Sequence, residues 1–301
     1  MMTSTLTAIR SMCRGEVRES EPLARHTSLA IGGPADLFII PEDRADVVAL
    51  MAILIPTAIP RLVVGAGYNL LVRDGGFRGA VISLERLNGL QFMAVDGCIS
   101  AEAGTGLAQL VRFAQQQGLT GIEFLSGIPG TVGGAVAVNA GAHGAAIMDR
   151  VEVLTTLQEG RTAIRDRTEL EFGYRHLRLE PGEIVLEALI RLEPASPDVI
   201  AERIEACLEH RRKAQKVQFS SAGSFFKNPP GRQAWQLIDQ AGLRGATVGG
   251  AQVSEAHANF LVNRGGATAA DFLELAALIK EKVRQVSGVE LEEEVRIVGD
   301  A

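Results

Sequence analysis

The sequence is poor in cysteine. Its 301 residues contain three cysteines, Cys13, Cys98 and Cys207, which are widely spaced and form no CxxC pattern. An odd number of cysteines without such a spacing predicts neither a disulfide framework nor a zinc site. We therefore expect a protein of a reducing compartment that holds no structural metal.

Long apolar runs are lacking as well. A membrane-spanning helix needs about 20 consecutive apolar residues, and the longest apolar runs here fall well short of that length. Residues 1–20 carry three arginines and two glutamates and have no apolar core of signal-peptide length. These absences predict a cytoplasmic protein without membrane insertion.

An excess of positive charge is also missing, because the formal net charge is −6. Proteins that bind the phosphate backbone of nucleic acids are usually strongly basic, so this balance argues against nucleic acid as a partner. An anionic ligand would have to be bound by local groups. Glycine, in contrast, is abundant at 33 residues, above the usual share of about 7%. Its clusters are the first candidate sites.

The hydrophobic pattern predicts a small α/β unit over residues 1–86. The chain is long enough for two or three domains of about 100–150 residues. Period-2 and period-3.6 patterns locate the elements of this first unit. They are strands at Asp36–Ile40, Arg61–Val64 and Ala80–Leu84, and a helix that Asp43 caps and that runs to Ile55.

Residues 87–195 are predicted to form an α+β unit with a glycine-rich segment at its centre. Its predicted elements are strands at Phe92–Val95, Cys98–Ala103, Val151–Leu157 and Ile184–Arg191, and a helix at Gly106–Gln117 that ends before Gly118. Pro194–Pro197 indicates a linker. Residues 196–301 then form a third domain, with helices at Asp198–Lys213, Gln233–Gln240 and Ala269–Val286 and strands at Asn259–Asn263 and Leu291–Val298.

The first glycine cluster is Gly65-Ala66-Gly67-Tyr68-Asn69-Leu70-Leu71. It resembles the start of a dinucleotide-binding fingerprint, but Leu70 stands where G-x-G-x-x-G needs its third glycine. The residues after Gly67 also alternate like a strand, whereas the Rossmann loop opens a helix, so the Rossmann interpretation fails. A nest of backbone N–H groups can still bind phosphate. A tight turn between two strands explains the motif equally well.

The second cluster runs from Gly127 to Gly141. Glycine loses much conformational entropy on folding, so its concentration indicates backbone that something must approach closely. A large flat ligand fits this segment, since Pro129 stiffens it and Thr131 and Asn139 offer hydrogen bonds. Close packing of a helix of small residues remains the alternative.

Five segments together resemble the UDP-N-acetylenolpyruvoylglucosamine reductases, the MurB family of peptidoglycan precursor synthesis. They occur in order along nearly the whole chain. The segments are Arg25-His26-Thr27-Ser28 with Gly32-Gly33-Pro34-Ala35-Asp36; Gly65 to Leu71; Gly127 to Gly141; Ala222-Gly223-Ser224-Phe225-Phe226-Lys227-Asn228-Pro229; and Leu291-Glu292-Glu293-Glu294-Val295-Arg296.

The resemblance implies an α+β fold in which a two-lobed FAD-binding module of the vanillyl-alcohol-oxidase type precedes a smaller substrate-binding domain. The lobes would be residues 1–86 and 87–195, and the substrate domain 196–301. It also implies non-covalent FAD, reduced by NADPH, with no flavin attached to His26. The FAD contacts implied are Gly65, Ala66, Gly67, Tyr68, Asn69, Leu70, Gly127, Gly130, Thr131, Gly133, Gly134, Asn139 and Gly141.

The reaction implied is reduction of the enolpyruvyl ether of UDP-N-acetylglucosamine to UDP-N-acetylmuramate. Hydride addition to the enol ether leaves negative charge on C2 and the adjacent carboxylate, so the site needs a cation beside the carboxylate and an acid beside C2. By resemblance these groups are Arg175, Ser224 and Glu294. Taken alone, Arg175 is better explained by a surface salt bridge, and Ser224 by an ordinary loop serine.

The choice of Glu294 within Glu292-Glu293-Glu294 rests on the family pattern, which has the acid directly before Val-Arg. Strand alternation would put Glu292 on the same face and Glu293 on the other. The resemblance further implies substrate contacts at Tyr174, Lys227, Asn228 and His257. The sequence leaves open whether Arg211, Arg212, Lys213 or Lys216 contacts phosphate, because a solvated helix end explains them equally well.

One departure from part of the family is informative. Some members carry an insertion whose tyrosine folds over the substrate, whereas this chain has only Tyr68 and Tyr174, both inside motifs already named. We expect the shorter subclass. Two other functions compete: an FAD oxidase of alcohols or sugar lactones on the same module, and a non-enzymatic flavin or nucleotide-sugar binder. Neither gives residues 223–229 and Glu294 an evident role.

Overall fold

The computed structural model describes residues 2–93, 97–214 and 217–301. The chain forms two compact units, each assembled from several segments. The first unit comprises Met1–Glu19, Leu37–Ala66 and Gly79–His210, and the second comprises Ser20–Asp36, Gly67–Arg78 and Arg211–Ala301. The segments of the two units alternate along the chain, so this division does not test the domain boundaries expected after residues 86 and 195. Those boundaries remain predictions.

A four-stranded sheet contains the first predicted strands. Its order is β1 (Glu16–Pro22), β2 (Pro34–Ile40), β5 (Phe77–Ser83) and β3 (Arg61–Val64), and β3 runs parallel to β5. Helix α2 (Arg44–Leu54) begins as predicted, since the side chain of Asp43 accepts the N–H of Asp46. Sequence patterns did not predict β1 or helix α1 (Met2–Met12). Most residues of β1 are charged or polar and are not buried, so its sequence shows no alternation of apolar and polar residues.

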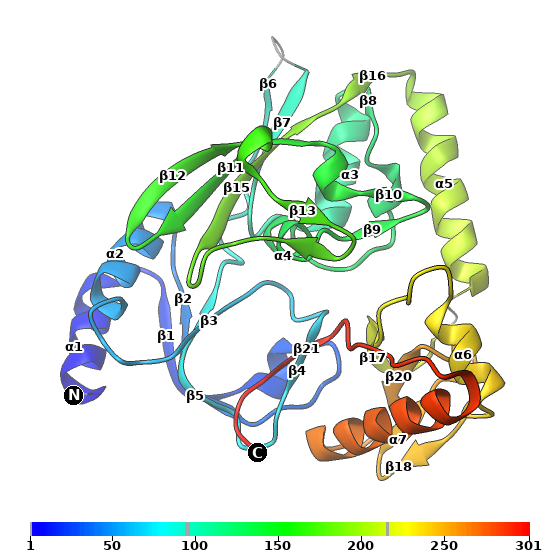
Figure 1. The fold of residues 1–301 in the computed structure, drawn as a ribbon. Helices are drawn as coiled ribbons and strands as arrows, with labels where there is room; N and C mark the ends of the chain where they lie inside the picture. The colour runs from blue at the N-terminus through cyan, green and yellow to red at the C-terminus, as the bar shows by residue number, and fades with distance from the viewer. Residues whose placement is uncertain (1, 94–96, 215–216) are drawn as a thin grey trace. The chain divides into compact units, whose positions relative to one another are not determined.

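An antiparallel five-stranded sheet dominates the first unit (Figure 1). Its order is β12 (Arg161–Asp166), β11 (Val151–Gln158), β15 (Ile184–Arg191), β7 (Cys98–Glu102) and β6 (Leu90–Met93). The predicted strands of this region are confirmed. The end of the one predicted at Phe92–Val95 lies outside the described residues.

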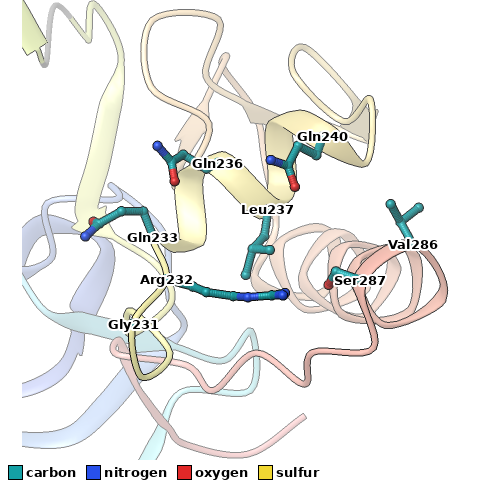
Figure 2. Close-up of a pocket in the computed structure, with 8 residues that line it drawn as sticks. All are labelled: Gly231, Arg232, Gln233, Gln236, Leu237, Gln240, Val286 and Ser287. Atoms are coloured by element: carbon teal, nitrogen blue, oxygen red, sulfur yellow. The ribbon is translucent and has the colours of Figure 1, made fainter.

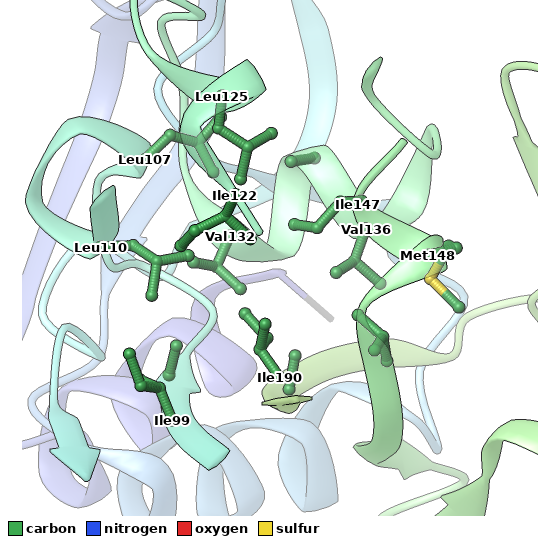
Figure 3. Close-up of a cluster of buried hydrophobic side chains, with 14 of the residues drawn as sticks. Ile99, Leu107, Leu110, Ile122, Leu125, Val132, Val136, Ile147, Met148 and Ile190 are labelled. Atoms are coloured by element: carbon green, nitrogen blue, oxygen red, sulfur yellow. The ribbon is translucent and has the colours of Figure 1, made fainter. Parts of the chain in front are cut away.

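Two helices share a hydrophobic core with this sheet (Figure 3). Helix α3 (Leu107–Gln116) buries Leu107, Leu110, Val111 and Ala114, which recur at helical spacing and form one apolar face. Gly118 follows with a φ of +67° and ends the helix as predicted. The short helix α4 (Val132–Ala137) puts Val132 and Val136 into the same core, so the second glycine cluster is anchored there.

Short elements complete the first unit. Three pairs of two-residue strands form: β8 (Leu119–Thr120) with β16 (Glu193–Pro194), β9 (Gly141–Ala142) with β10 (Ala145–Ala146), and β13 (Phe172–Gly173) with β14 (His176–Leu177). Single 3-10 turns of this unit occur at Glu123–Leu125, Ile147–Asp149 and Arg167–Glu169, and a further turn at Leu23–His26 belongs to the second unit. Helix α5 (Pro197–Ala214) starts soon after β16, so the expected linker at Pro194–Pro197 contains the ends of both elements. No helix in the described part of the chain is long and apolar enough to span a membrane.

The second unit is built on a four-stranded antiparallel sheet and two helices. The sheet order is β17 (Ser220–Ser224), β20 (Phe260–Asn263), β19 (Ala251–Val253) and β18 (Thr247–Val248). The helices are α6 (Ala234–Gln240) and α7 (Ala269–Ser287), close to their predicted bounds. In the same unit, β4 (Leu70–Val72) pairs in parallel with β21 (Arg296–Val298).

The strand predicted at Leu291–Val298 is wrong in its first half. Only Arg296–Val298 forms the regular strand β21. The preceding residues bond instead to the segment after β17: the N–H of Lys227 donates to the carbonyl of Glu292, and the N–H of Glu294 donates to the carbonyl of Phe225, both at 2.8 Å. The faces of the three glutamates therefore do not follow from strand alternation.

Candidate active site

The two glycine clusters meet in the first unit at Gly65 and Thr131. Gly65 directly follows β3, and a Cβ atom added to it would lie 2.4 Å from the Oγ1 of Thr131. Thr131 is buried and pairs as an isolated bridge with Gly106, and the N–H of Val132 donates to the carbonyl of Thr105 at 2.8 Å. The close approach explains why residue 65 lacks a side chain, since a Cβ would displace Thr131.

The glycines of the second cluster have different physical causes. Gly130 has a φ of +132° and a Cβ there would meet no atom within 4 Å, so its backbone conformation requires glycine. At Gly133 a Cβ would lie 2.8 Å from the Cβ of Ala103, so packing requires glycine there. The packing alternative thus holds at Gly133, inside α4. It does not hold at Gly130.

The glycine clusters fit a large flat ligand that carries phosphates. Gly65, Ala66, Gly127 and Gly134 are exposed, so backbone without bulky side chains faces outward from both clusters. Immediately before Gly127, the hydroxyl of Ser126 is buried and has no hydrogen-bond partner among the described residues. A buried hydroxyl without a partner costs free energy, so an added hydrogen-bonding group would stabilise the protein at this edge.

Asn139, a predicted FAD contact, is buried and bonded within the protein. Its Nδ2 donates to the carbonyl of Gly173 at 2.8 Å, and its Oδ1 accepts the N–H of Met148 at 3.2 Å. Its φ of +44° lies in the left-handed region, which asparagine tolerates better than most residues. The amide of Asn139 therefore ties the glycine-rich segment to the β13–β14 hairpin.

That hairpin carries Tyr174 and Arg175 on its two-residue turn. Gly173 pairs with His176 across the hairpin, and Arg175 has a φ of +53°. The guanidinium lies 5.3 Å from the centre of the Tyr174 ring, and its Nη2 donates to the carbonyl of Gly141 at 3.1 Å. A bulky residue in this conformation is strained, and such strain clusters at functional sites. The role of Arg175 in the reaction remains a prediction.

In the second unit, the continuation of the first glycine cluster contacts the C-terminal segment. Gly67 has a φ of +68°, and a Cβ there would lie 1.9 Å from the carbonyl oxygen of His26. Tyr68 is exposed. The Nδ2 of Asn69 donates to the carbonyl of Glu294 at 3.1 Å, and Leu70 begins β4. A predicted cofactor residue and a predicted catalytic residue are therefore bonded directly.

Ser224 and Glu294 are linked through the backbone of Phe225 in the second unit. Ser224 ends β17 opposite Phe260, after a β-bulge at which Gly223 has a φ of +76°. The next residue, Phe225, accepts the N–H of Glu294 at 2.8 Å. Both side chains are half-buried. The backbones of two of the predicted catalytic residues are thus close to each other, while Arg175 belongs to the first unit.

The three consecutive glutamates have different surroundings. Glu292 forms an ion pair with Lys227, and Glu293 forms one with Lys280 at 3.1 Å. Two of the three carboxylates are thereby accounted for by lysine partners on the protein. Glu294 as the site acid remains a prediction.

The predicted substrate contacts of the second unit are partly used inside the fold. The Oδ1 of Asn228 accepts the N–H of Ala234 at 3.0 Å, where α6 begins. The Nδ1 of His257 accepts the N–H of Asn259 at 3.3 Å, and its ring centre lies 4.6 Å from that of Phe260. Burial, followed by the positive charge of Arg244, lowers the pKa of His257. Burial therefore favours the neutral form of His257.

The four candidates for phosphate contact near the end of α5 are Arg211, Arg212, Lys213 and Lys216. Arg212 is exposed, and burial lowers the pKa of the half-buried Arg211. Lys216 and the side chain of Lys213 lie outside the described residues. Which of the four contacts phosphate stays a prediction that the structure does not narrow.

A polar groove of about 470 Å³ lies between α6 and the end of α7 (Figure 2). Its lining residues are Gly231, Arg232, Gln233, Gln236, Leu237, Gln240, Val286 and Ser287. None of these lining residues is a predicted catalytic or binding residue. The groove therefore shares no lining residue with the candidate site.

Comparison with known proteins assigns both parts of the chain. Residues 35–161 match the family model of an FAD binding domain, and residues 215–298 match that of the UDP-N-acetylenolpyruvoylglucosamine reductase C-terminal domain. The fold class is thus that of an α+β FAD-binding flavoprotein with a separate C-terminal domain, as the sequence analysis expected.

Full-length relatives narrow the class to a family. The chain is 60% identical to the UDP-N-acetylenolpyruvoylglucosamine reductase of Geotalea uraniireducens over 99% of both chains, and 57% identical to that of Geobacter sulfurreducens over 95% of both. The crystal structure of the Thermus caldophilus reductase (MurB) superposes with a TM-score of 0.81 at 36% identity, covering 94% of this chain and 98% of that one. The chain belongs to the UDP-N-acetylenolpyruvoylglucosamine reductase family, and it is an FAD-binding oxidoreductase.

Proposed function

We propose that the chain reduces the enolpyruvyl ether of UDP-N-acetylglucosamine to UDP-N-acetylmuramate, using FAD and NADPH, in peptidoglycan precursor synthesis in the cytoplasm. The observation that carries the proposal is the 60% identity to a named reductase over 99% of both chains. The Ser224–Phe225–Glu294 arrangement of the second unit supports it, because the backbone of Phe225 links two residues that the resemblance assigns to the reaction. The oxidase and the non-enzymatic binder give this arrangement no role.

The proposed roles follow from charge and geometry. When bound, FAD supplies the hydride carrier between NADPH and the substrate. Arg175 grips the substrate carboxylate, since a guanidinium can bind it in bidentate fashion and offset the charge that develops there. Ser224 delivers the proton to C2, and Glu294 acts beside it. A serine is a weak acid in water, but the enediolate-like carbanion is basic enough to take its proton.

Substrate binding in this proposal uses both charged and neutral groups. Lys227 faces the diphosphate and exchanges its partner Glu292 for a phosphate when substrate arrives. Asn228, His257 and Tyr174 contribute hydrogen bonds or ring contact to the UDP-sugar. Because burial favours the neutral form of His257, the positive charge at the phosphates is assigned to lysine or arginine.

The central test is the visible spectrum of the purified protein. A flavin band should be present, should bleach with NADPH under anaerobic conditions, and should return when the enolpyruvyl substrate is added. A protein purified without any flavin band would overturn the proposal. The flavin absorbance therefore follows reduction by NADPH and reoxidation by the substrate separately.

Replacing Ser224 by Ala separates the proton donor from the rest of the site. Flavin reduction by NADPH needs no acid at C2 and should keep its rate, while reoxidation by substrate should slow by about 10²–10⁴. Ser224→Cys should restore part of the activity, because a thiol is the stronger acid. Ser221→Ala, on the same strand β17, is the matched control and should change neither step. Equal slowing of both steps in Ser224→Ala would contradict the assigned role.

A further inference from the structure

The segment that carries Ser224 leaves the regular sheet just where the serine stands. β17 and β20 pair normally at Ser220 with Asn263 and at Ser221 with Val262, and the register then shifts before Ser224 meets Phe260. A bulge re-aims the following side chain but also interrupts the ladder of backbone hydrogen bonds. The residues after Ser224 therefore need another source of order.

Asn259 supplies that order with its side chain. Its Oδ1 accepts the N–H of Phe226 at 3.0 Å, and its Nδ2 donates to the carbonyl of the same residue at 2.8 Å. Its own carbonyl accepts the N–H of Phe225 at 2.7 Å. The side-chain amide thus pairs with one residue as a neighbouring strand would, and it is only 3% exposed.

The same two phenylalanines bind the C-terminal segment from their other edge. Phe225 accepts the N–H of Glu294, Phe226 forms an isolated bridge with Glu293, and Lys227 donates its N–H to the carbonyl of Glu292. Both phenylalanine rings are buried in the core of the second unit. One buried amide is therefore connected, through a single dipeptide, to the segments that carry both residues proposed to act at C2.

We propose that Asn259 is a positioning residue for the reaction, one that sets the spacing of Ser224 and Glu294 through the backbone of Phe225 and Phe226. The expected effect on turnover rests on the proposed function. The pair of hydrogen bonds between the Asn259 side chain and Phe226, called the clamp below, is independent of it. An error of about 1 Å in the placement of a catalytic group can cost about 10²-fold in rate, so loss of the clamp affects chemistry without removing a reacting group.

Asn259→Asp is the informative variant. It preserves size and the acceptor for the Phe226 N–H, but an ionised carboxylate cannot donate to the Phe226 carbonyl, whereas a protonated one can. Reoxidation by the enolpyruvyl substrate should therefore slow by about 10²-fold at high pH and recover as pH falls. Flavin reduction by NADPH should stay within about twofold of wild type throughout.

Asn263→Asp is the matched control. Asn263 is the last residue of β20, the strand that begins directly after Asn259, and it also bonds backbone at both ends of its amide. It donates to the carbonyl of Leu29 at 3.0 Å and accepts the N–H of Gly265 at 2.9 Å. It does not bond to residues 225–227. Its exchange should leave the pH profile of reoxidation unchanged, and a profile shared by both variants would overturn the proposal.

A measurement on the unaltered protein covers the case in which Asn259→Asp fails to fold. The Phe226 N–H is bonded by the Asn259 side chain, so its hydrogen–deuterium exchange should be as slow as that of the core strands. Fast exchange at Phe226 would overturn the clamp even if the enzyme is active. Slow exchange in a protein without flavin or reductase activity would preserve the clamp and refute the proposed function alone.

Discussion

Arg175 offers a test in which strain and function are separated by two substitutions at one position. Its φ of +53° places a long side chain in the left-handed region on the turn between β13 and β14. That conformation costs a residue with a Cβ about 1–2 kcal/mol, and glycine avoids the cost. Glycine in turn loses about 0.5–1 kcal/mol more backbone entropy on folding.

These magnitudes rank the two variants. Arg175→Gly and Arg175→Ala both lose the hydrogen bond to the Gly141 carbonyl, which contributes about 1 kcal/mol. Only the glycine variant relieves the strained backbone. Arg175→Gly should therefore be more stable than Arg175→Ala by about 0.5–1 kcal/mol, and close to the stability of the unaltered protein.

Turnover should not follow this ranking. Both variants lack the guanidinium, so reoxidation by the enolpyruvyl substrate should slow by about 10²–10³ in each, as when one charge-stabilising donor is removed. The assays are urea unfolding for stability and rapid mixing for the two half-reactions. Glu159, at a φ of +49° in the β11–β12 turn, is the matched control. Glu159→Gly and Glu159→Ala should reproduce the stability order and leave both half-reactions unchanged.

Two outcomes would refute the reasoning about Arg175. If Arg175→Ala proves as stable as Arg175→Gly, the left-handed conformation is not a source of strain in solution. If substrate turnover survives in both variants, the arginine is a surface residue and the carboxylate is bound elsewhere.

Two further predictions concern stability. Gly65→Ala should lose about 1–3 kcal/mol in urea unfolding, because its Cβ would lie 2.4 Å from the Thr131 Oγ1. Adding Thr131→Ala should recover part of that loss although it removes the cap of α4, and strictly additive losses would contradict the contact. Burial alone would raise the pKa of Asp46, but N–H groups of Glu42, Arg14 and Gly15 bond its carboxylate and lower that pKa overall. Its stabilisation is thus present above about pH 4 and lost as pH falls through the depressed value, so Asp46→Asn should lose about 2 kcal/mol near pH 7 and flatten the acid limb of unfolding.

Elements with a strong local signal were predictable to within a residue or two. β3 and β15 match their predicted bounds because each is a bounded run of mostly buried apolar residues. The strand predicted at Leu291–Val298 was wrong in its first half. The three consecutive glutamates show no alternation of polar and apolar residues, and their backbone bonds to residues 225–227. A pattern of side chains cannot reveal a backbone partner some 65 positions away.

The sequence by itself determined the family, the glycine clusters, and the identities of Arg175, Ser224 and Glu294 as candidates, because these are properties of order and spacing along the chain. Only the tertiary structure decided that Gly65 meets Thr131 and that Gly133 is glycine for packing. It also paired Glu292 with Lys227 and Glu293 with Lys280. Asn259, which was predicted to lie in a strand and had no assigned role, is the side chain that bonds to Phe226. Such contacts join residues far apart in the chain, and a side-chain amide bonding to distant backbone leaves no periodicity or motif in the sequence that could predict it.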